Sequence, residues 1–296
     1  PPGAGASWTE QLQNAPLGGG IRYSGPADVL FSFAGLADQQ LTGGLAVAAD
    51  FNGRLSDPRL NGVVRANSLT YENESFGTRV TQMRLDGRFT SDHLEIRDFS
   101  GRAGDGTVQA TGDVGLAANS GFPINIAVKL DRARLARSEA ITSVVSGTLN
   151  ITNSAANGGL IKGDLRLPET RYRVAWQGGT EIRQLTGVRR KGEGTDLLDQ
   201  RLADRKAAAA PKPWKLDIRV RADNEIYVTG MGLDSEWKTN MRVTGTATDP
   251  RVVGQVEVIR GRYSFSGHQF ELEQGLISFN GPMTNPTLPI FWMVPC

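Results

Sequence analysis

The sequence predicts an all-β fold built on an elongated, mostly antiparallel sheet; the residue pattern alone does not decide whether this sheet forms a curved trough with an apolar interior. Three observations support this prediction. Apolar and polar residues alternate through many runs of roughly five to nine residues, which is typical of strands with one apolar and one polar face. Glycine is abundant, at 36 of 296 residues, or about 12% against a usual 7%. Helical patterns are few.

The clearest alternation is "WKLDIRVRA" at 214–222. It places Trp214, Leu216, Ile218, Val220 and Ala222 on one face and Lys215, Asp217, Arg219 and Arg221 on the other. "PINIAVKL", "TLNIT", "GDLRL" and "RYRVAW" repeat the pattern. Turn signals such as Asp86-Gly87 and Asn157-Gly158 separate these runs. We therefore expect more than a dozen strands, joined mostly to their sequence neighbours and for that reason antiparallel.

One turn phrase occurs twice, as "SDPRLNG" around Asp57 and "TDPRVVG" around Asp249. Asp-Pro favours a turn, because proline fixes φ and the aspartate side chain can bond to the following backbone. Gly62 and Gly254 then open Val-rich runs. "MTNPTL" at 283–288 is a weaker third copy. The phrase marks the start of long strands in a repeated, elongated β structure.

The chain divides into a first β segment at 1–182, a polar linker or insertion at 183–213 and a second β segment at 214–296. The linker holds the best helix candidate, 194–210, with Thr195 as its N-cap. Residues 138–145 fit either one helical turn or a strand. The first residues, PPGAGASW, indicate a start within a longer protein, so we expect any membrane anchor to lie upstream, and the ending PIFWMVPC also indicates truncation.

Histidine and cysteine, the residue types that most often act in catalysis or bind metals, are scarce, and we predict no catalytic, cofactor-binding or metal-binding residues. The two histidines, His93 and His268, are far apart, and Cys296 is the only cysteine. Neither "DNE" at 223–225 nor "GRAGDG" at 101–106 has the context of a metal or dinucleotide site. A net charge of +2 gives no support for a nucleic-acid partner. We expect the protein not to be an enzyme.

A regular apolar face must be covered. Two arrangements fit the alternation equally: a sandwich in which two sheets cover each other, and a trough whose interior is left for a ligand. Residues 214–288 favour the trough, because four ordered blocks within them resemble the C-terminal region of the TamB family, in the superfamily of AsmA-like bridge proteins. These blocks are "IYVTGMGLDSEW", "VTGTATDPRVVGQVEV", "GRYSFSGHQFEL" and "GLISFNG…NPTL".

The resemblance implies a periplasmic protein, anchored in the inner membrane by an upstream segment and linked to outer-membrane biogenesis. It implies a curved β trough, a barrel-assembly partner in the outer membrane similar to TamA, outer-membrane β-barrel clients and phospholipid. Since "PIFWMVPC" replaces the usual continuation of the family after Leu288, we expect the region that docks on the partner to be partly or wholly absent.

Two functions are compatible with this trough. In the first, it conducts phospholipid, with acyl chains along the apolar face. The expected lining residues are Leu216, Ile218, Val220, Ile226, Val228, Val256, Val258, Phe270, Leu272, Ile277 and Phe279. In the second, an open sheet edge pairs with a strand of a nascent barrel, and Gly261 marks a bulge where the apolar positions change parity. A secreted β-helix enzyme or adhesin fits less well, because no stripe of carboxylates and aromatics is present.

Overall fold

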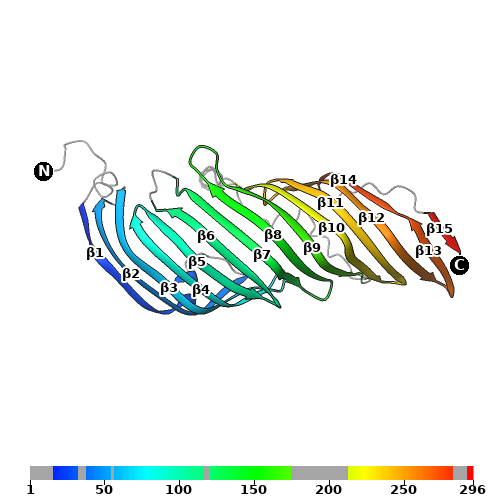
Figure 1. Ribbon diagram of the computed structural model, residues 1–296, viewed down its shortest axis with the longest axis horizontal. Helices are drawn as coiled ribbons and strands as arrows, with labels where there is room; N and C mark the ends of the chain where they lie inside the picture. The colour runs from blue at the N-terminus through cyan, green and yellow to red at the C-terminus, as the bar shows by residue number, and fades with distance from the viewer. Residues whose placement is uncertain are drawn as a thin grey trace, which may run out of the picture.

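The chain folds into one long curved sheet of fifteen strands (Figure 1). The computed structural model describes residues 16–32, 38–54, 57–116, 121–174, 213–282 and 292–295. The strands are β1 (Pro16–Pro26), β2 (Gln39–Arg54), β3 (Asp57–Asn73), β4 (Thr78–Ser91), β5 (His93–Ala103), β6 (Gly106–Gly115), β7 (Ile124–Arg137), β8 (Ile141–Asn153), β9 (Leu160–Arg173), β10 (Lys215–Gly230), β11 (Leu233–Gly245), β12 (Pro250–Phe265), β13 (His268–Gln274), β14 (Leu276–Pro282) and β15 (Trp292–Pro295). The predicted all-β fold is confirmed.

The strands follow the order of the sequence from β1 to β13. At the far end β13 and β14 both pair with β12, along different halves of it, and β15 pairs with β13. All neighbours are antiparallel except β9 and β10, which are parallel. The prediction of a mostly antiparallel sheet is confirmed. The parallel pair lies at a junction where a long connection joins the two strands, since parallel neighbours cannot be joined by a hairpin. The junction coincides with the boundary between the two predicted β segments.

Two local features differ in how well the sequence predicted them. Residues 141–145 belong to β8, so the strand alternative for 138–145 is the correct one. A short helix that the sequence did not predict, α2 (Ala27–Phe31), follows β1 and places Ala27 in the core. The helix predicted at 194–210 and the third turn phrase at 283–288 lie outside the described residues.

The repeated turn phrase opens a long strand in both places: β3 begins at Asp57 and β12 at Pro250. The glycines that follow lie where the neighbouring strand approaches closely. A Cβ at Gly62 would collide with the backbone of Ala48 and Ala49, and one at Gly254 with that of Asn240 and Met241. Gly254 also has a φ of +143°, outside the range that other residues readily adopt. Glycine at these positions lets the sheet curve.

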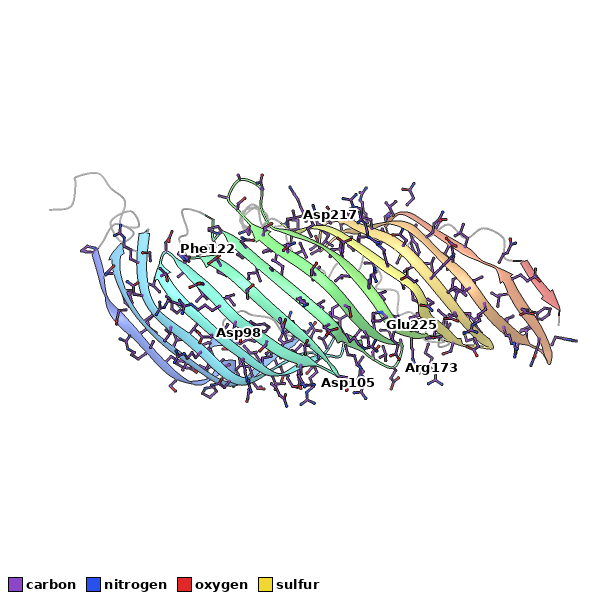
Figure 2. The ribbon with its side chains drawn as sticks, in the orientation of Figure 1. Asp98, Asp105, Phe122, Arg173, Asp217 and Glu225 are labelled. Atoms are coloured by element: carbon purple, nitrogen blue, oxygen red, sulfur yellow. The ribbon has the colours of Figure 1, made fainter. Side chains whose placement is uncertain are left out.

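The hairpins alternate between two long edges of the sheet. We call "lower edge" the one formed by the turns 73–78, 103–106, 137–141, 230–233 and 265–268, and "upper edge" the one formed by the turns 91–93, 115–124, 153–160 and 245–250. In Figure 2, Asp105 and Arg173 mark the lower edge, and Phe122 and Asp217 lie toward the upper edge.

A crease runs along the sheet between these edges. Pairing registers shift at one level in most strand pairs, and four residues other than glycine adopt positive φ at these shifts: Ser68 (64°), Gln82 (51°), Arg132 (47°) and Glu225 (75°). Such bulges bend a strand and increase its twist. Buried residues follow the same line, among them Leu69, Met83, Ala133, Val145, Ala222 and Trp237. The crease is therefore the floor of a trough with an upper and a lower wall.

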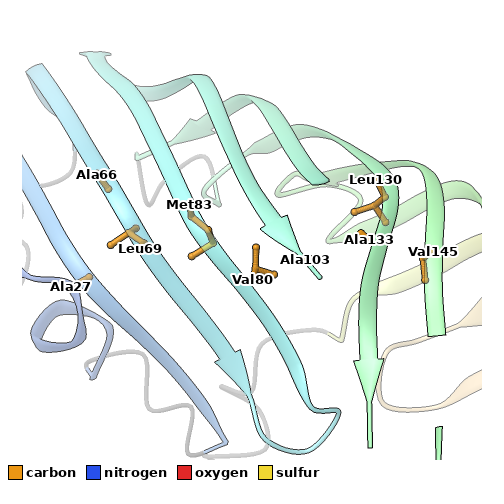
Figure 3. Packing of buried hydrophobic residues seen from close by; sticks show 9 residues of the cluster. All are labelled: Ala27, Ala66, Leu69, Val80, Met83, Ala103, Leu130, Ala133 and Val145. Carbon is orange, nitrogen blue, oxygen red and sulfur yellow. The ribbon is translucent and has the colours of Figure 1, made fainter. Parts of the chain in front are cut away.

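The first part of the trough closes on itself at the lower edge. β5 and β6 are short, and beyond their hairpin β4 contacts β7. The backbone N–H of Arg137 donates to the carbonyl of Phe76 over 3.0 Å, and the Thr78 hydroxyl donates to the carbonyl of Leu135. Figure 3 shows the buried cluster that results. Its members are Ala27, Ala66, Leu69, Val80, Met83, Ala103, Leu130, Ala133 and Val145.

Candidate ligand groove

One face of the sheet carries an apolar row along its whole length. Residues that pair across neighbouring strands lie on the same face, so the registers can be followed from strand to strand. One uninterrupted row contains only apolar residues and glycine. It runs through Gly25, Leu45, Ala66, Leu85, Phe99, Ala110, Val128, Leu149, Gly163, Ile218, Val243, Val252 and Gly281. We call this side of the sheet the inner face and the opposite side the outer face.

The predicted lining residues all lie on the inner face, but on different parts of it. Leu216, Ile218 and Val220 of β10 pair with Ile161, Gly163 and Leu165 of β9 on the upper wall. Val256 pairs with Ile277, and Phe279 pairs with Gly254, at the far end of the same wall. All six predicted residues on the upper wall are half-buried, so their side chains retain exposed surface. The upper wall from β10 to β14 therefore carries these half-exposed residues, with Val252 and Thr239 buried between them.

Two other predicted residues lie at the crease. Ile226 and Val258 pair with Trp237 from either side, and Trp237 is buried. A register shift next to this pair leaves Ile259 of β12 without a partner on β11. The apolar positions of this strand change parity as predicted, but the bulge predicted at Gly261 is wrong by two residues: Gly261 pairs in register with Ser235, and Ile259 is the extra residue. Ile226 and Val258 belong mainly to the floor.

The remaining three residues lie below the crease. Val228 pairs with Ser235, and Phe270 pairs with Tyr263. Leu272, two residues further along β13, is buried. The structure thus places the predicted residues on two walls and a floor, rather than in one cluster.

The prediction omitted the inner face of β11, which includes Trp237, Met241 and Val243. Their alternation in "LDSEWKTNMRV" is interrupted by Ser235 and Thr239, both of which are buried on the same face. The structure shows why these polar residues are tolerated. Ser235 accepts a hydrogen bond from the Trp237 indole over 2.8 Å, and the Thr239 hydroxyl donates to the carbonyl of Gln255 over 2.8 Å. Burying a hydroxyl group costs little free energy when it is hydrogen-bonded.

The outer face carries the charges, many of them in ion pairs between strands. The Lys238 ammonium lies 2.7 Å from Glu257, and Arg242 lies 2.7 Å from Asp217. The hydrogen bond from Arg242 lowers the pKa of Asp217, with smaller contributions from Lys162 and Arg219. These exposed ion pairs make the outer face polar, so it does not favour contact with acyl chains.

A shallow depression of about 540 Å³ lies over β10, β11, β12 and β14. Its side chains include Lys238, Asn240, Gln255, Glu257 and Ser278. Since these residues alternate with the inner positions of their strands, the depression belongs mainly to the outer face. Ala222, Thr239, Gly254 and Phe279, which are inner-face positions, also contribute to its lining.

Neither histidine has the surroundings of a catalytic base. His93 Nδ1 lies 3.2 Å from Asp92, which lowers the pKa of that carboxyl, but both side chains are exposed at a turn. Among the described residues no group of three or more His, Cys, Asp or Glu side chains is placed to hold a metal ion. The "DNE" residues, 223–225, form part of the bulge in β10. The described helix, α2, has five residues, and no helix in the described part of the chain is long and apolar enough to cross a membrane.

Comparisons with known proteins agree with this architecture. The family model of the TamB C-terminal domain matches residues 94–291, two thirds of the chain. The chain is also 26% identical over 282 residues to the translocation and assembly module subunit TamB of Haemophilus influenzae. That match covers 86% of this chain and 20% of the relative, so the chain spans about a fifth of its length. No solved structure matches. By the family model and the long apolar trough, the chain belongs to the TamB family.

Proposed function

We propose that the inner face conducts phospholipid between the inner and outer membranes. The observation that supports this most strongly is the uninterrupted apolar row from Gly25 of β1 to Gly281 of β14. Side chains of an ordinary core are covered by a second layer. On the upper wall from β10 to β14, by contrast, most inner residues remain half-exposed, although Val252 and Thr239 are buried. An acyl chain lying on them would remove both surfaces from water.

The energetic gain from such a groove is substantial. Each CH₂ group removed from water contributes about 0.8 kcal/mol, so an unaided acyl chain crosses an aqueous compartment only slowly. A continuous row lets a chain move from one apolar position to the next without being fully exposed. The headgroup remains in water at the mouth of the trough. No energy source or catalytic residue is needed for this step.

Family membership supports the cellular setting that we propose. The relative is named as a subunit of a translocation and assembly module. We infer that this chain acts in the periplasm as part of a longer protein anchored in the inner membrane, that its outer-membrane partner resembles TamA, and that it is not an enzyme.

Mass spectrometry of lipid extracted from protein purified without detergent tests the conduit. We expect phospholipid in stoichiometric amounts. Ile218→Asp combined with Phe279→Asp should remove it, because two carboxylates would then lie on the apolar inner face. Val253→Asp is the matched control, since Val253 is half-exposed on the outer face of β12. Lipid loss in both variants, or folded wild-type protein without lipid, would argue against the conduit.

A second function, assembly of outer-membrane β-barrel proteins, is favoured by the edges of the sheet. β1 pairs only with β2, and β14 only with β12, among the described strands. Each therefore presents unpaired backbone groups that a client strand can pair with. The groove would shelter the lipid-facing side of that client.

Photoreactive residues at Ser278 of β14 and Ser24 of β1 test this second function. Cross-links to barrel precursors, reduced by a proline at a neighbouring edge position, would support strand pairing. Labelling of phospholipid at Ile218 without any labelling of precursors at these edges would support the conduit alone.

A further inference from the structure

The lower edge of the trough differs between its two halves. Over β4 to β7 it is closed by the contact of Phe76 and Thr78 with β7. From β8 to β13 no pair of non-neighbouring strands makes a contact of comparable extent among the described residues. We call this second stretch the open lower edge, since Tyr172 and Phe265 are exposed along it.

At the open lower edge, the last side chains of the inner face are apolar and exposed. Tyr172 of β9 pairs with Ile141 of β8 and with Val228 of β10, which places all three on the inner face. Tyr172 is 45% exposed, and Phe265 at the end of β12 is 62% exposed. Phe265 stacks on Tyr263 with ring centroids 6.3 Å apart. Aromatic side chains in such positions suit a boundary between hydrocarbon and water.

An arginine lies directly beside this aromatic boundary. Arg173 follows Tyr172 in β9, so it leaves the strand on the outer side of the same edge (Figure 2). It is exposed and pairs in register with Thr229. No ion pair with a carboxylate is found for it among the described side chains, whereas Arg171 is bonded to Glu169 at 3.1 Å. Long arginine side chains can reach around an apolar surface to a polar group.

We propose that phospholipid enters or leaves the groove sideways over the open lower edge. Tyr172, Tyr263 and Phe265 contact the acyl chains there, and Arg173 binds the phosphate of the headgroup. Guanidinium groups match the oxygens of a phosphodiester. This assignment rests on the proposed conduit and adds the position at which lipid crosses the wall.

Photo-cross-linking of the full-length protein in cells grown with radioactive phosphate tests the position. Benzoylphenylalanine at Tyr172 and at Phe265 should label phospholipid, as should the same residue at Ile218 inside the groove. Phe76 is the matched control: it is 65% exposed at the same edge, but at the closed part. We expect labelling at Phe76 to be at least severalfold weaker.

The outcomes separate the two proposals. Labelling at Ile218 but not at Tyr172 or Phe265, or equal labelling at Phe76, would overturn lateral entry and leave the conduit intact. No phospholipid at any position would overturn the conduit itself.

The role of Arg173 has its own test. Arg173→Gln should slow uptake of lipid from vesicles of phosphatidylethanolamine and phosphatidylglycerol by about tenfold, the effect of losing one charged hydrogen bond. Arg137→Gln is the control, because Arg137 is also exposed at the lower edge but belongs to the closed part. Equal rates for the two variants would exclude a specific phosphate contact at Arg173.

Discussion

The trough has two halves: the closed part, β3 to β8, which contains the closed edge, and the open part, β9 to β14, beyond it. Both use the same alternating strands but differ in how their inner face is covered. In the closed part, side chains from both walls form one buried cluster around Met83 and Ala133. In the open part, Ala222 and Trp237 are buried at the crease, and most of the upper wall, apart from Val252 and Thr239, remains half-exposed. The comparison shows that one strand pattern can make a buried core in one place and a half-exposed apolar surface in another.

The largest effect should come from truncation in the closed cluster. Met83 is 4% exposed, so Met83→Ala should lower the free energy of unfolding by about 2–5 kcal/mol through lost burial and a new cavity. Val220→Ala, on the half-exposed upper wall, should cost clearly less. Urea unfolding of both variants measures the difference. Equal losses would contradict the distinction between core and groove.

The next largest loss of stability should come from substituting a glycine at which the sheet curves in the open part. Gly254→Ala should destabilise the protein by about 1–3 kcal/mol, because alanine is strained at its positive φ and its Cβ would meet the backbone of β11. Gly44→Ala is the control, since no atom lies within 4 Å of a Cβ there. Thermal unfolding should show a lower midpoint for the first variant only. A neutral Gly254→Ala would mean that the curvature does not depend on this glycine.

A buried hydroxyl pair tests the junction between the two parts. Ser143 of β8 and Thr170 of β9 are both buried, and their hydroxyl oxygens lie 2.9 Å apart. Thr170→Val would leave the Ser143 hydroxyl unpaired and should cost about 1–2 kcal/mol. Adding Ser143→Ala should recover part of this loss. A double variant no more stable than the single one would show that the hydrogen bond is not the cause.

The smallest effect concerns charge on the outer face. The pKa of Asp217 is lowered in the folded state by Arg242, so its contribution to stability is present above the unfolded pKa of about 3.9. It is lost as pH falls through the lower folded value. Unfolding midpoints of wild type and Asp217→Asn should therefore differ slightly at pH 5 and converge in stronger acid. A difference that grows on acidification would contradict this ion pair as the cause.

Much of the sheet could be predicted because period-two alternation is a local signal. It identified the inner residues of β10 correctly, from Leu216 to Val220. It could not show that Ser68 and Gln82 adopt a left-handed backbone conformation, because serine and glutamine are not residue types that indicate a bulge. The contact between β4 and β7 could not be predicted from the sequence either, because it depends on the shortness of the two strands between them and on contacts between residues far apart in the chain.

The groove was predicted only in part for a related reason. Ser235 and Thr239 interrupt the alternation of β11, and their hydrogen bonds become visible only in three dimensions. The position of Ile226 and Val258 at the floor, beside the buried Trp237, depends on the crease. Alternation gives the face of a residue but not its height on the wall.

The most direct test of the account compares two adjacent residues of β10 on opposite faces. Benzoylphenylalanine would be placed at Ile218, on the inner face, or at Arg219, on the outer face, in the full-length protein. Cells grown with radioactive phosphate would then be irradiated. The account predicts strong labelling of phospholipid from Ile218 and little from Arg219. Equal labelling from the two positions, or none from Ile218 in a folded protein, would contradict it.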